Sequence, residues 1–421
     1  MYPKHFIKEI WFDRLSRQIQ PSTNLMEHQD PAYSELSSSQ QRQRLQELAV
    51  VFLRLGTIAF GGPAAHISMM DEEIVERRQW ISREKLLDLL GITNLIPGPN
   101  STELAIHIGY ERGGLWGLAI AGACFILPAM LIVWGLAAVY VQTQAIPQVG
   151  WLLYGIKAVI VAIVVQALWK LGQKALKDTP TVVAAIAVTI AYFLNINEIL
   201  LLLLGGIAVM LFKNWQRRRD LGAMGAWMVP MGAISQVTPL PSAVPAPTGF
   251  SIFLFFLKIG CVLYGSGYVL LAFLQTGLVE QRHWLTSQQL LDAVAIGQFT
   301  PGPVFTTATF IGYLLAGNIG AIAATVGIFL PAFVLVALVN PWVPKLRQSP
   351  WASGFLDGVN AASMGLMAGV TYVLARTALV DWVTITVAIL SAIAVFRFKI
   401  NSAWLVLAGG IIGFLAKLLS V

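Results

Sequence analysis

The sequence predicts an all-α polytopic membrane protein built from two homologous repeats of about six hydrophobic segments each. Two observations support this fold class. Of the 421 residues, 57% are hydrophobic and 12% are charged, whereas in soluble domains about 25% are charged. The motif Pro-Gly-Pro also occurs twice within apolar stretches, at residues 97–99 and 301–303. From 97 to 301 the offset is 204 residues, and it predicts a duplicated unit.

The duplication extends well beyond these motifs. At the same offset, glycine, tryptophan and charged positions of the first half recur in the second half. The matches include Gly56 with Gly260, Gly61 with Gly265, Glu76 with Glu280, Arg78 with Arg282, Trp80 with Trp284 and Asp88 with Asp292. After a shift of one residue, Gly109-Tyr110 matches Gly312-Tyr313 and Leu127-Pro128-Ala129 matches Leu330-Pro331-Ala332. So many coincidences in one register indicate an internal repeat.

We divide the chain into a polar leader at 1–47, a first transporter repeat at 48–212, a linker at 213–250 and a second repeat at 251–421. Most apolar segments approach the roughly 20 residues that a membrane-spanning helix needs. They cover residues 48–70, 86–108, 115–141, 151–171, 181–194 and 198–212, then 251–274, 288–315, 321–339, 354–374, 379–396 and 403–418. The segments 181–194 and 198–212 are short, which suggests tilted or incomplete crossings.

The leader carries several basic residues and no apolar core of the signal-peptide kind, so we expect it to stay in the cytoplasm. Ile7, Ile10, Trp11, Leu15 and Ile19 would form one face of an amphipathic helix on the membrane surface. A solvated leader without a role in transport is the simpler alternative.

The Pro-Gly-Pro motifs predict broken helices. Two prolines remove backbone N–H donors, and the glycine between them adds freedom, so a helix should end there and a new one begin. The N-terminus of the new helix would then offer amides to an anion. The candidate substrate-binding residues here are Pro97, Gly98, Pro99, Asn100, Ser101 and Thr102 in the first half, and Pro301, Gly302, Pro303, Thr306 and Thr307 in the second.

Matched positive charges interrupt the first apolar segment of each half. Arg54 and Lys258 are costly inside a membrane, so each marks a transport path, a partner or a helix end where the side chain snorkels. Just beyond them, Gly61-Gly62 and Gly265 loosen the segment. We include these five residues among the candidates for substrate binding, with ordinary helix packing as the alternative for the glycines.

Four residues are candidates for proton coupling. Asp88 and Asp292 begin the segments that carry the Pro-Gly-Pro motifs, where they would carry a proton or cap a helix. Glu103 and His107 occur only in the first half, and their spacing of four residues places them on one helical face. Lys157 lies inside another apolar segment and is likewise without a charged counterpart, since Asn360 is nearest its matched position.

The sequence offers no sign of a metal site, a cofactor or an enzyme active site. Cys124 and Cys261 stand apart in apolar segments, and the chain has no HExxH motif and no phosphate-binding glycine loop. The net charge of +7 fits positive-inside loops better than nucleic-acid binding, since Arg217, Arg218 and Arg219 adjoin a membrane segment.

Loop charges predict that the two halves have opposite orientations. The loop at 142–150 lacks Lys and Arg, whereas its counterpart contains Lys345 and Arg347. The bias reverses after the next segment, where the first half has three lysines and the second has only Arg376. Basic residues favour the cytoplasm, so we expect an inverted repeat. Inversion requires an odd number of crossings per half, which six segments do not supply.

The stretches Phe60-Gly61-Gly62-Pro63, Glu76-Arg77-Arg78-Gln79-Trp80 and Pro97-Gly98-Pro99, repeated in the second half, resemble the chromate ion transporter family in its long two-domain form. The resemblance covers nearly everything from Leu48 to Val421. It implies a multi-pass carrier of the bacterial inner membrane that expels chromate, energised by the proton motive force. Ser266-Gly267 replaces Gly62-Pro63 in the second half, so the two breaks need not have equal roles.

Chromate and sulfate are tetrahedral dianions of similar size, so a sulfate permease is the close alternative to chromate efflux. A passive anion channel and a membrane-embedded enzyme are further alternatives. The expected partners are chromate or sulfate and the lipid bilayer, without nucleic acid, and a homo-oligomer is left open.

Overall fold

A computed structural model describes residues 33–59, 62–93, 96–143, 146–220, 246–264, 267, 269–339, 350–398 and 400–419. Most of the leader lies outside this part, and so do Gly61, Gly265, Lys345, Arg347 and residues 221–245 of the linker. The chain divides into two compact units, residues 1–41 and 42–421. In the first unit a 3₁₀ turn at Tyr33–Glu35 is held by the Gln41 side chain, which donates to the Tyr33 carbonyl at 3.0 Å. The second unit contains both repeats.

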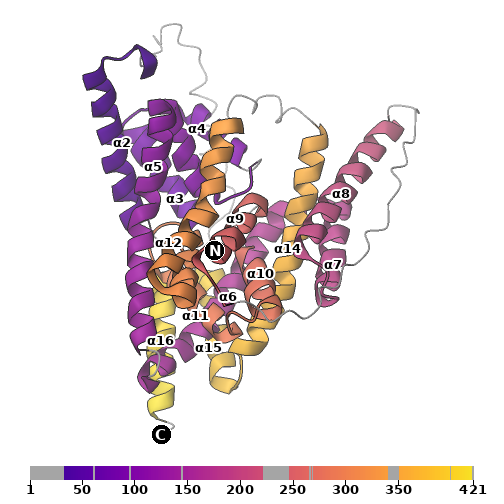
Figure 1. Cartoon of the computed structure of the whole chain (residues 1–421). Coiled ribbons are helices and arrows are strands. Elements are labelled where there is room, and N and C mark those ends of the chain that lie inside the picture. Colours follow the sequence, from indigo (N-terminus) through magenta and orange to yellow (C-terminus); the bar gives the residue numbers. More distant parts are fainter. Residues whose placement is uncertain are drawn as a thin grey trace, which may run out of the picture. The chain divides into compact units, whose positions relative to one another are not determined.

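The described secondary structure of this unit is helical, and the helices recur in the same order in both halves. Figure 1 shows their arrangement. In the first half they are α2 (Ser38–Ile58), α3 (Pro63–Met70), the π-helix η2 (Asp71–Arg77), α4 (Arg83–Thr93), α5 (Asn100–Thr143), α6 (Pro147–Ala175), α7 (Thr179–Phe193) and α8 (Glu198–Asp220). In the second half they are α9 (Gly249–Val262), α10 (Leu270–Leu274), the π-helix η3 (Gln275–Gln281), α11 (Ser287–Phe299), the 3₁₀ turn η4 (Val304–Thr306), α12 (Thr307–Val339), α14 (Pro350–Ala378), α15 (Trp382–Phe398) and α16 (Ser402–Leu418).

The predicted breaks at Pro-Gly-Pro are confirmed, and they are wider than the motif itself. In the first half α4 ends at Thr93 and α5 begins at Asn100. In the second half α11 ends at Phe299, and α12 begins at Thr307 after the turn η4. The stretches predicted at 86–108 and 288–315 are therefore not single helices. Within 86–108, neither the helical part before the break nor the part after it has the roughly 20 residues that a crossing requires.

The helices α5 and α12 each reverse direction near their start. The backbone leaves the helical region at Gly113 and Gly114 in α5 and at Ala316 and Gly317 in α12. In α12 the hydroxyls of Thr309 and Thr325 are 2.7 Å apart, although 16 residues of straight helix would separate them by about 24 Å. Each label therefore covers a tight helical hairpin. Gly109 and Gly117 contact each other directly across the hairpin of α5.

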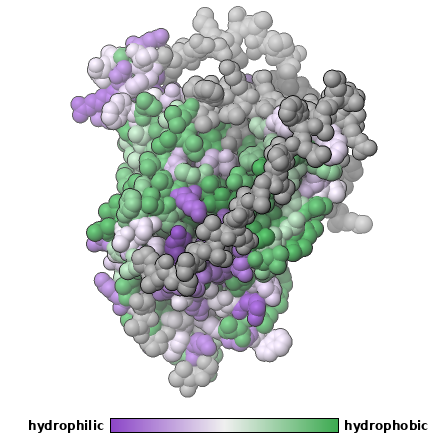
Figure 2. All heavy atoms as spheres, turned by 45° about the vertical axis from the view of Figure 1, so that its right-hand side comes forward, coloured by the Kyte–Doolittle hydropathy of each residue, from purple (hydrophilic) through white to green (hydrophobic). Residues whose placement is uncertain are grey.

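The surface is that of a membrane protein. Five stretches of the described part are long and apolar enough to cross a bilayer: Asn100–Thr143, Gln148–Ala175, Glu198–Trp215, Val304–Leu338 and Trp351–Ala378. Large apolar side chains such as Trp116, Trp169 and Ile411 are exposed, and apolar residues cover broad areas of the face in Figure 2. Lipid contact accounts for such a surface, which a soluble protein would not tolerate.

The two halves pack against each other rather than side by side as separate bundles. Helix α14 of the second half lies against α7 and α8 of the first (Figure 1), and α6 of the first half lies against α15 and α16. Backbones touch directly where Gly155 meets Gly409 and where Gly358 meets Gly205. Glycines at such crossings allow close approach, because no Cβ separates the helices.

Candidate functional site

The candidate site is the place where the two Pro-Gly-Pro turns meet the broken first segments of the opposite half. The N–H of Gly98 donates to the carbonyl of Leu263 at 2.8 Å, and the N–H of Gly302 donates to the carbonyl of Ala59 at 2.9 Å. Both donors and both acceptors are matched at the offset of 204 residues. Each half therefore gives and receives the same hydrogen bond, and we call this arrangement the junction.

Backbone chemistry explains why these atoms pair. Ala59 directly follows α2, and Leu263 caps the C-terminus of α9, where carbonyls have no partner within their own helix. In each turn the flanking prolines lack N–H groups, so the glycine N–H is the motif's one donor. A break in one half thus supplies the acceptor that a turn in the other half needs.

Both glycines hold backbone conformations that other residues rarely adopt. Gly98 has φ of +145° and Gly302 has φ of +91°. A Cβ on Gly98 would collide with the Glu103 carboxylate, and one on Gly302 would lie 2.6 Å from the Ala129 Cβ. The turns are therefore fully packed as well as strained for any other residue.

His66 joins the broken segment of the first half to the start of α5. Its Nε2 lies 3.1 Å from the Ala59 carbonyl, and its Nδ1 lies 3.1 Å from the Ser101 hydroxyl. Because a carbonyl only accepts, we assign the imidazole proton to Nε2, and Ser101 then donates to Nδ1 of the neutral ring. The Phe125 ring packs edge-on against this histidine at 5.5 Å. Ala59 thus receives hydrogen bonds from both halves.

His66 was missed by sequence reasoning. Comparison of the repeats could not mark it, because Leu270 occupies the matched position. A lone histidine three residues after the proline of Gly-Gly-Pro was the available signal.

Glu103 is the buried carboxylate of the junction. Its exposed fraction is 0%, and among the described residues neither carboxylate oxygen has a hydrogen-bond partner. The contact with Gly98 places it against the tip of the first turn, where the sequence analysis placed an anion. His107, one helical turn further, is also fully buried. A second negative charge at this place would be strongly repelled while Glu103 is ionised.

The predicted small polar residues lie at the turns, but two of their four hydroxyls are used locally. Thr306 donates to the Pro303 carbonyl and Thr307 to the Val304 carbonyl, each at 2.8 Å. Thr102 is fully buried, and its hydroxyl has no partner within the described part. The remaining predicted members of the turns are Pro97, Pro99, Asn100, Pro301 and Pro303, of which all but Asn100 are buried. Gly62 follows the first break with φ of +77°.

The matched aspartates have different surroundings. Asp88 is exposed, whereas Asp292 is buried in α11 with an exposed fraction of 4%. Lys157 of α6 forms an ion pair with Asp292 at 2.9 Å, and the Tyr140 hydroxyl donates to the same carboxylate at 2.8 Å. Two isolated charges of the sequence analysis are thus partners, and they link the halves.

The matched cations Arg54 and Lys258 lie away from the junction. Both are exposed on the first helices of their halves. Arg54 is 4.0 Å from the Glu73 carboxylate, whereas Lys258 lines a pocket with Arg282.

Comparisons with known proteins agree with the repeat. The model of a family described as "Chromate transporter" matches residues 46–210 and again residues 250–414. A "Chromate transport protein" of Cupriavidus metallidurans is 33% identical over 384 residues, covering 88% of this chain and 93% of the relative. A "Chromate transport protein" of Pseudomonas aeruginosa is 30% identical over 389 residues, covering 88% and 92%. No solved structure matches the chain significantly. With two copies of the family domain on one duplicated chain, this protein belongs to the chromate transporter family in its long two-domain form.

Proposed function

We propose that the protein exports chromate as a dianion through a path that opens at the junction. The observation that carries the proposal is the reciprocal pair of hydrogen bonds between turns and breaks. Broken helices at the interface of repeats are the usual place for substrate in secondary transporters. Among the described residues, the backbone hydrogen bonds of Gly98 and Gly302 and the His66 contacts join the turns to the breaks, so these would have to break for the turns to separate. The freed N–H groups of Gly98 and Gly302 would then become donors for an oxyanion.

Electrostatics favours the outward direction for this ion. A membrane potential of about 100 mV, negative inside, contributes about 4.6 kcal/mol toward expelling a dianion. Uptake of the same ion, as in a sulfate permease, would need coupled cations or protons. Efflux driven by the potential therefore needs the fewest additional assumptions.

Transport by purified protein in liposomes tests this function. Chromate trapped inside should leave faster when the interior is made negative with a potassium gradient and valinomycin, and it should leave unaltered. External sulfate that drives chromate counterflow would indicate a shared carrier site. Currents too large for a carrier would favour a channel, and a chemically altered anion would favour an enzyme. Vesicles that release chromate no faster than protein-free vesicles would contradict the proposal.

We further propose that chromate passes while Glu103 is neutral. The carboxylate lies at the tip of the first turn, without a hydrogen-bond partner among the described residues, so its negative charge and that of the dianion oppose each other. The other titratable groups nearby are His66, His107 and Tyr264, the last through an electrostatic interaction with Glu103.

We expect Glu103→Gln to transport chromate with a flatter pH dependence than the parent. Parent transport should fall as pH rises, because Glu103 then ionises, whereas a glutamine stays neutral. Initial rates in liposomes at matched internal and external pH measure this effect. His107→Gln is the control variant, which should keep the parent slope. An unchanged slope in Glu103→Gln would remove this residue from the coupling.

We also propose that the halves are inverted in the membrane. In the first half, the segment 86–108 would not cross the membrane if α4 and the first arm of α5 form a re-entrant pair. If α11 and the first arm of α12 do the same at 288–315, five of the six predicted segments in each half remain as crossings. Five is odd, so equivalent points of the two halves would face opposite sides, in agreement with the loop charges.

Site-specific labelling tests this topology. Single cysteines at Gln144 and Gln348, placed in a chain without Cys124 and Cys261, should react with a membrane-impermeant reagent from opposite sides. The assay uses sealed vesicles. As a control, both added thiols should react once the vesicles are permeabilised, which shows that each thiol is accessible to the reagent. Labelling of both from the same side would refute the inverted arrangement.

A further inference from the structure

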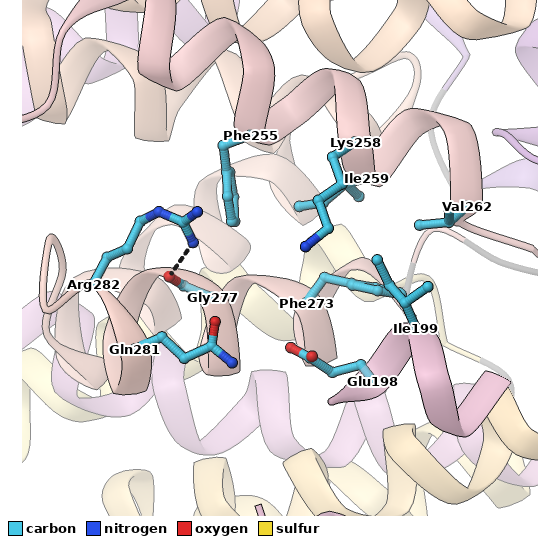
Figure 3. Close-up of a pocket in the computed structure, with 10 residues that line it drawn as sticks. All are labelled: Glu198, Ile199, Phe255, Lys258, Ile259, Val262, Phe273, Gly277, Gln281 and Arg282. Carbon is cyan, nitrogen blue, oxygen red and sulfur yellow. Dashed lines mark hydrogen bonds between the residues drawn. The ribbon is translucent and has the colours of Figure 1, made fainter. Parts of the chain in front are cut away.

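A charged pocket lies among α8 of the first half and α9, α10 and η3 of the second, and its lining shares no residue with the junction. Its volume, open solvent included, is about 310 Å³. Its charged and polar lining comprises Lys258, Arg282, Gln281 and Glu198, and Phe255 and Gly277 complete the wall near the arginine (Figure 3). In Figure 3 the Lys258 ammonium points into the space between α9 and Glu198.

In the first half, the residues matched to the pocket lining surround a carboxylate. There the Glu73 carboxylate accepts from Arg78 at 2.8 Å and lies 3.6 Å from Arg77 and 4.0 Å from Arg54. Glu73 is buried in η2, so its charge is compensated by these three arginines. The first half thus has a carboxylate bound in a cationic cluster.

The second half keeps most of this cluster but lacks the carboxylate. At the offset of 204 residues, Arg54 becomes Lys258, Arg78 becomes Arg282, Arg77 becomes Gln281 and Glu73 becomes Gly277. Both π-helices have the same length, and the residue after each arginine, Gln79 or His283, has a positive φ. The backbone frame is therefore the same in both halves, and the second half differs by the loss of one acidic side chain, with the Phe255 ring packed against Gly277.

The two cations of the pocket have no ion pair of the first-half kind. Among the described residues, no carboxylate lies within 4.0 Å of Lys258 or Arg282. Arg282 instead donates to the Gly277 carbonyl at 3.2 Å and stacks over Phe255 at 4.9 Å. Glu198 faces the cations across the pocket as the one acid of its lining.

Another acid lies nearby but is occupied elsewhere. Glu280 does not line the pocket, and it accepts hydrogen bonds from Gln275 at 3.1 Å and from Tyr192 at 3.4 Å. Two cations of the lining, Lys258 and Arg282, thus face one lining carboxylate, that of Glu198.

We propose that this pocket binds a tetrahedral oxyanion group between Lys258 and Arg282, the residues matched to two of the arginines that bind the Glu73 carboxylate in the first half. A guanidinium presents paired N–H groups to two oxygens of such an anion, and an ammonium supplies further donors. Free chromate or sulfate and the phosphate of a lipid headgroup share this chemistry. The site goes beyond the proposed function, since its lining shares no residue with the junction and its binding of an anion does not require that chromate be exported.

A thiol at the mouth of the pocket reports its occupancy locally. Gln281 is exposed, and Gln281→Cys in a chain with Cys124→Ala and Cys261→Ala provides one reactive group. Molybdate is the probe, because it is a tetrahedral dianion that does not oxidise thiols as chromate does. We expect saturating molybdate to slow thiol modification about tenfold, and Arg282→Gln to weaken that protection about tenfold, since hydrogen bonds to charged groups contribute about 1.5–3 kcal/mol.

A second variant restores the missing carboxylate. A side chain at Gly277 would contact the Phe255 ring at 2.6 Å, and the residue matched to Phe255 is the smaller Val51. Phe255→Val with Gly277→Glu therefore copies the first half without this clash, and it should abolish protection by molybdate. Phe255→Val alone is the matched control and should keep it. Size-exclusion elution like that of the parent shows that each variant is folded.

Lipid composition distinguishes the two sources of the anion. In nanodiscs of neutral phosphatidylcholine, protection that appears only with molybdate supports a free oxyanion. In nanodiscs of phosphatidylglycerol, slow modification without molybdate that Arg282→Gln accelerates supports a lipid phosphate. Modification rates that respond neither to molybdate nor to anionic lipid would overturn the proposal.

The liposome assay separates this site from the proposed function. Protection by molybdate in a protein that moves no chromate would leave the pocket standing and remove the export function. Chromate efflux by the parent, without protection of the Gln281→Cys thiol by molybdate, would support the export function and remove the proposed anion site in the pocket.

Discussion

Replacing Lys157 with methionine is expected to destabilise the protein more than any other single change of a charged residue discussed above. The Lys157 ammonium and the Asp292 carboxylate are 2.9 Å apart, with exposed fractions of 7% and 4%. Loss of one partner leaves the other charge buried without compensation, which costs about 3–5 kcal/mol. The measurement is the thermal unfolding temperature of the detergent-purified protein, followed by dye binding or by loss of the monodisperse peak.

The paired substitution makes this prediction specific. Lys157→Met combined with Asp292→Leu removes both charges, so it should recover most of the lost stability. Tyr140→Phe is the milder companion, since it removes only the 2.8 Å hydrogen bond to Asp292; we expect it to cost about 1.5–3 kcal/mol. If Lys157→Met unfolds at the parent temperature, the ion pair does not hold α6 to α11.

The duplication and its broken helices could be predicted because the backbone effects of proline and glycine in Pro-Gly-Pro are local and do not depend on how the segment packs. Pro97 and Pro99 prevent a continuous helix wherever the segment packs. Because the two halves match at an offset of 204 residues, what is predicted for one turn also applies to the other. The hydrogen bonds of Gly98 and Gly302 are matched at the same offset. Local chemistry and repetition were thus enough to predict the internal repeat and the breaks at Pro-Gly-Pro.

Contacts between the halves could not be predicted in the same way. Lys157 and Asp292 pair across the interface of the repeats, and neither has a charged partner near it in the sequence. The pattern marked both as costly charges but not as partners, because pairing depends on how α6 packs against α11. Arg54 and Lys258 show the opposite case. Their matched positions suggested matched roles, yet Glu73 in one half and Gly277 in the other give them different surroundings.

Gly98→Val and Gly302→Val are expected to abolish chromate transport while the protein still inserts in the membrane. At φ of +145° and +91°, a β-branched residue is strained by about 1–3 kcal/mol. Overpacking against Glu103 or Ala129 adds about 1–3 kcal/mol more. The turn must then move, and the hydrogen bond to Leu263 or Ala59 is lost with it.

The expected result is an initial rate of chromate efflux below about a tenth of the parent rate. Each increase of about 1.36 kcal/mol in the activation free energy of transport lowers the rate tenfold. Binding of chromate or sulfate to the detergent-purified variants is the second measurement, and it should weaken in parallel. Gly135→Val is the matched control. A Cβ on Gly135 would meet no atom within 4 Å, so this variant should transport and bind like the parent. Parent-like affinity in both turn variants would place the anion outside the junction and leave the Pro-Gly-Pro turns as structural joints between the halves.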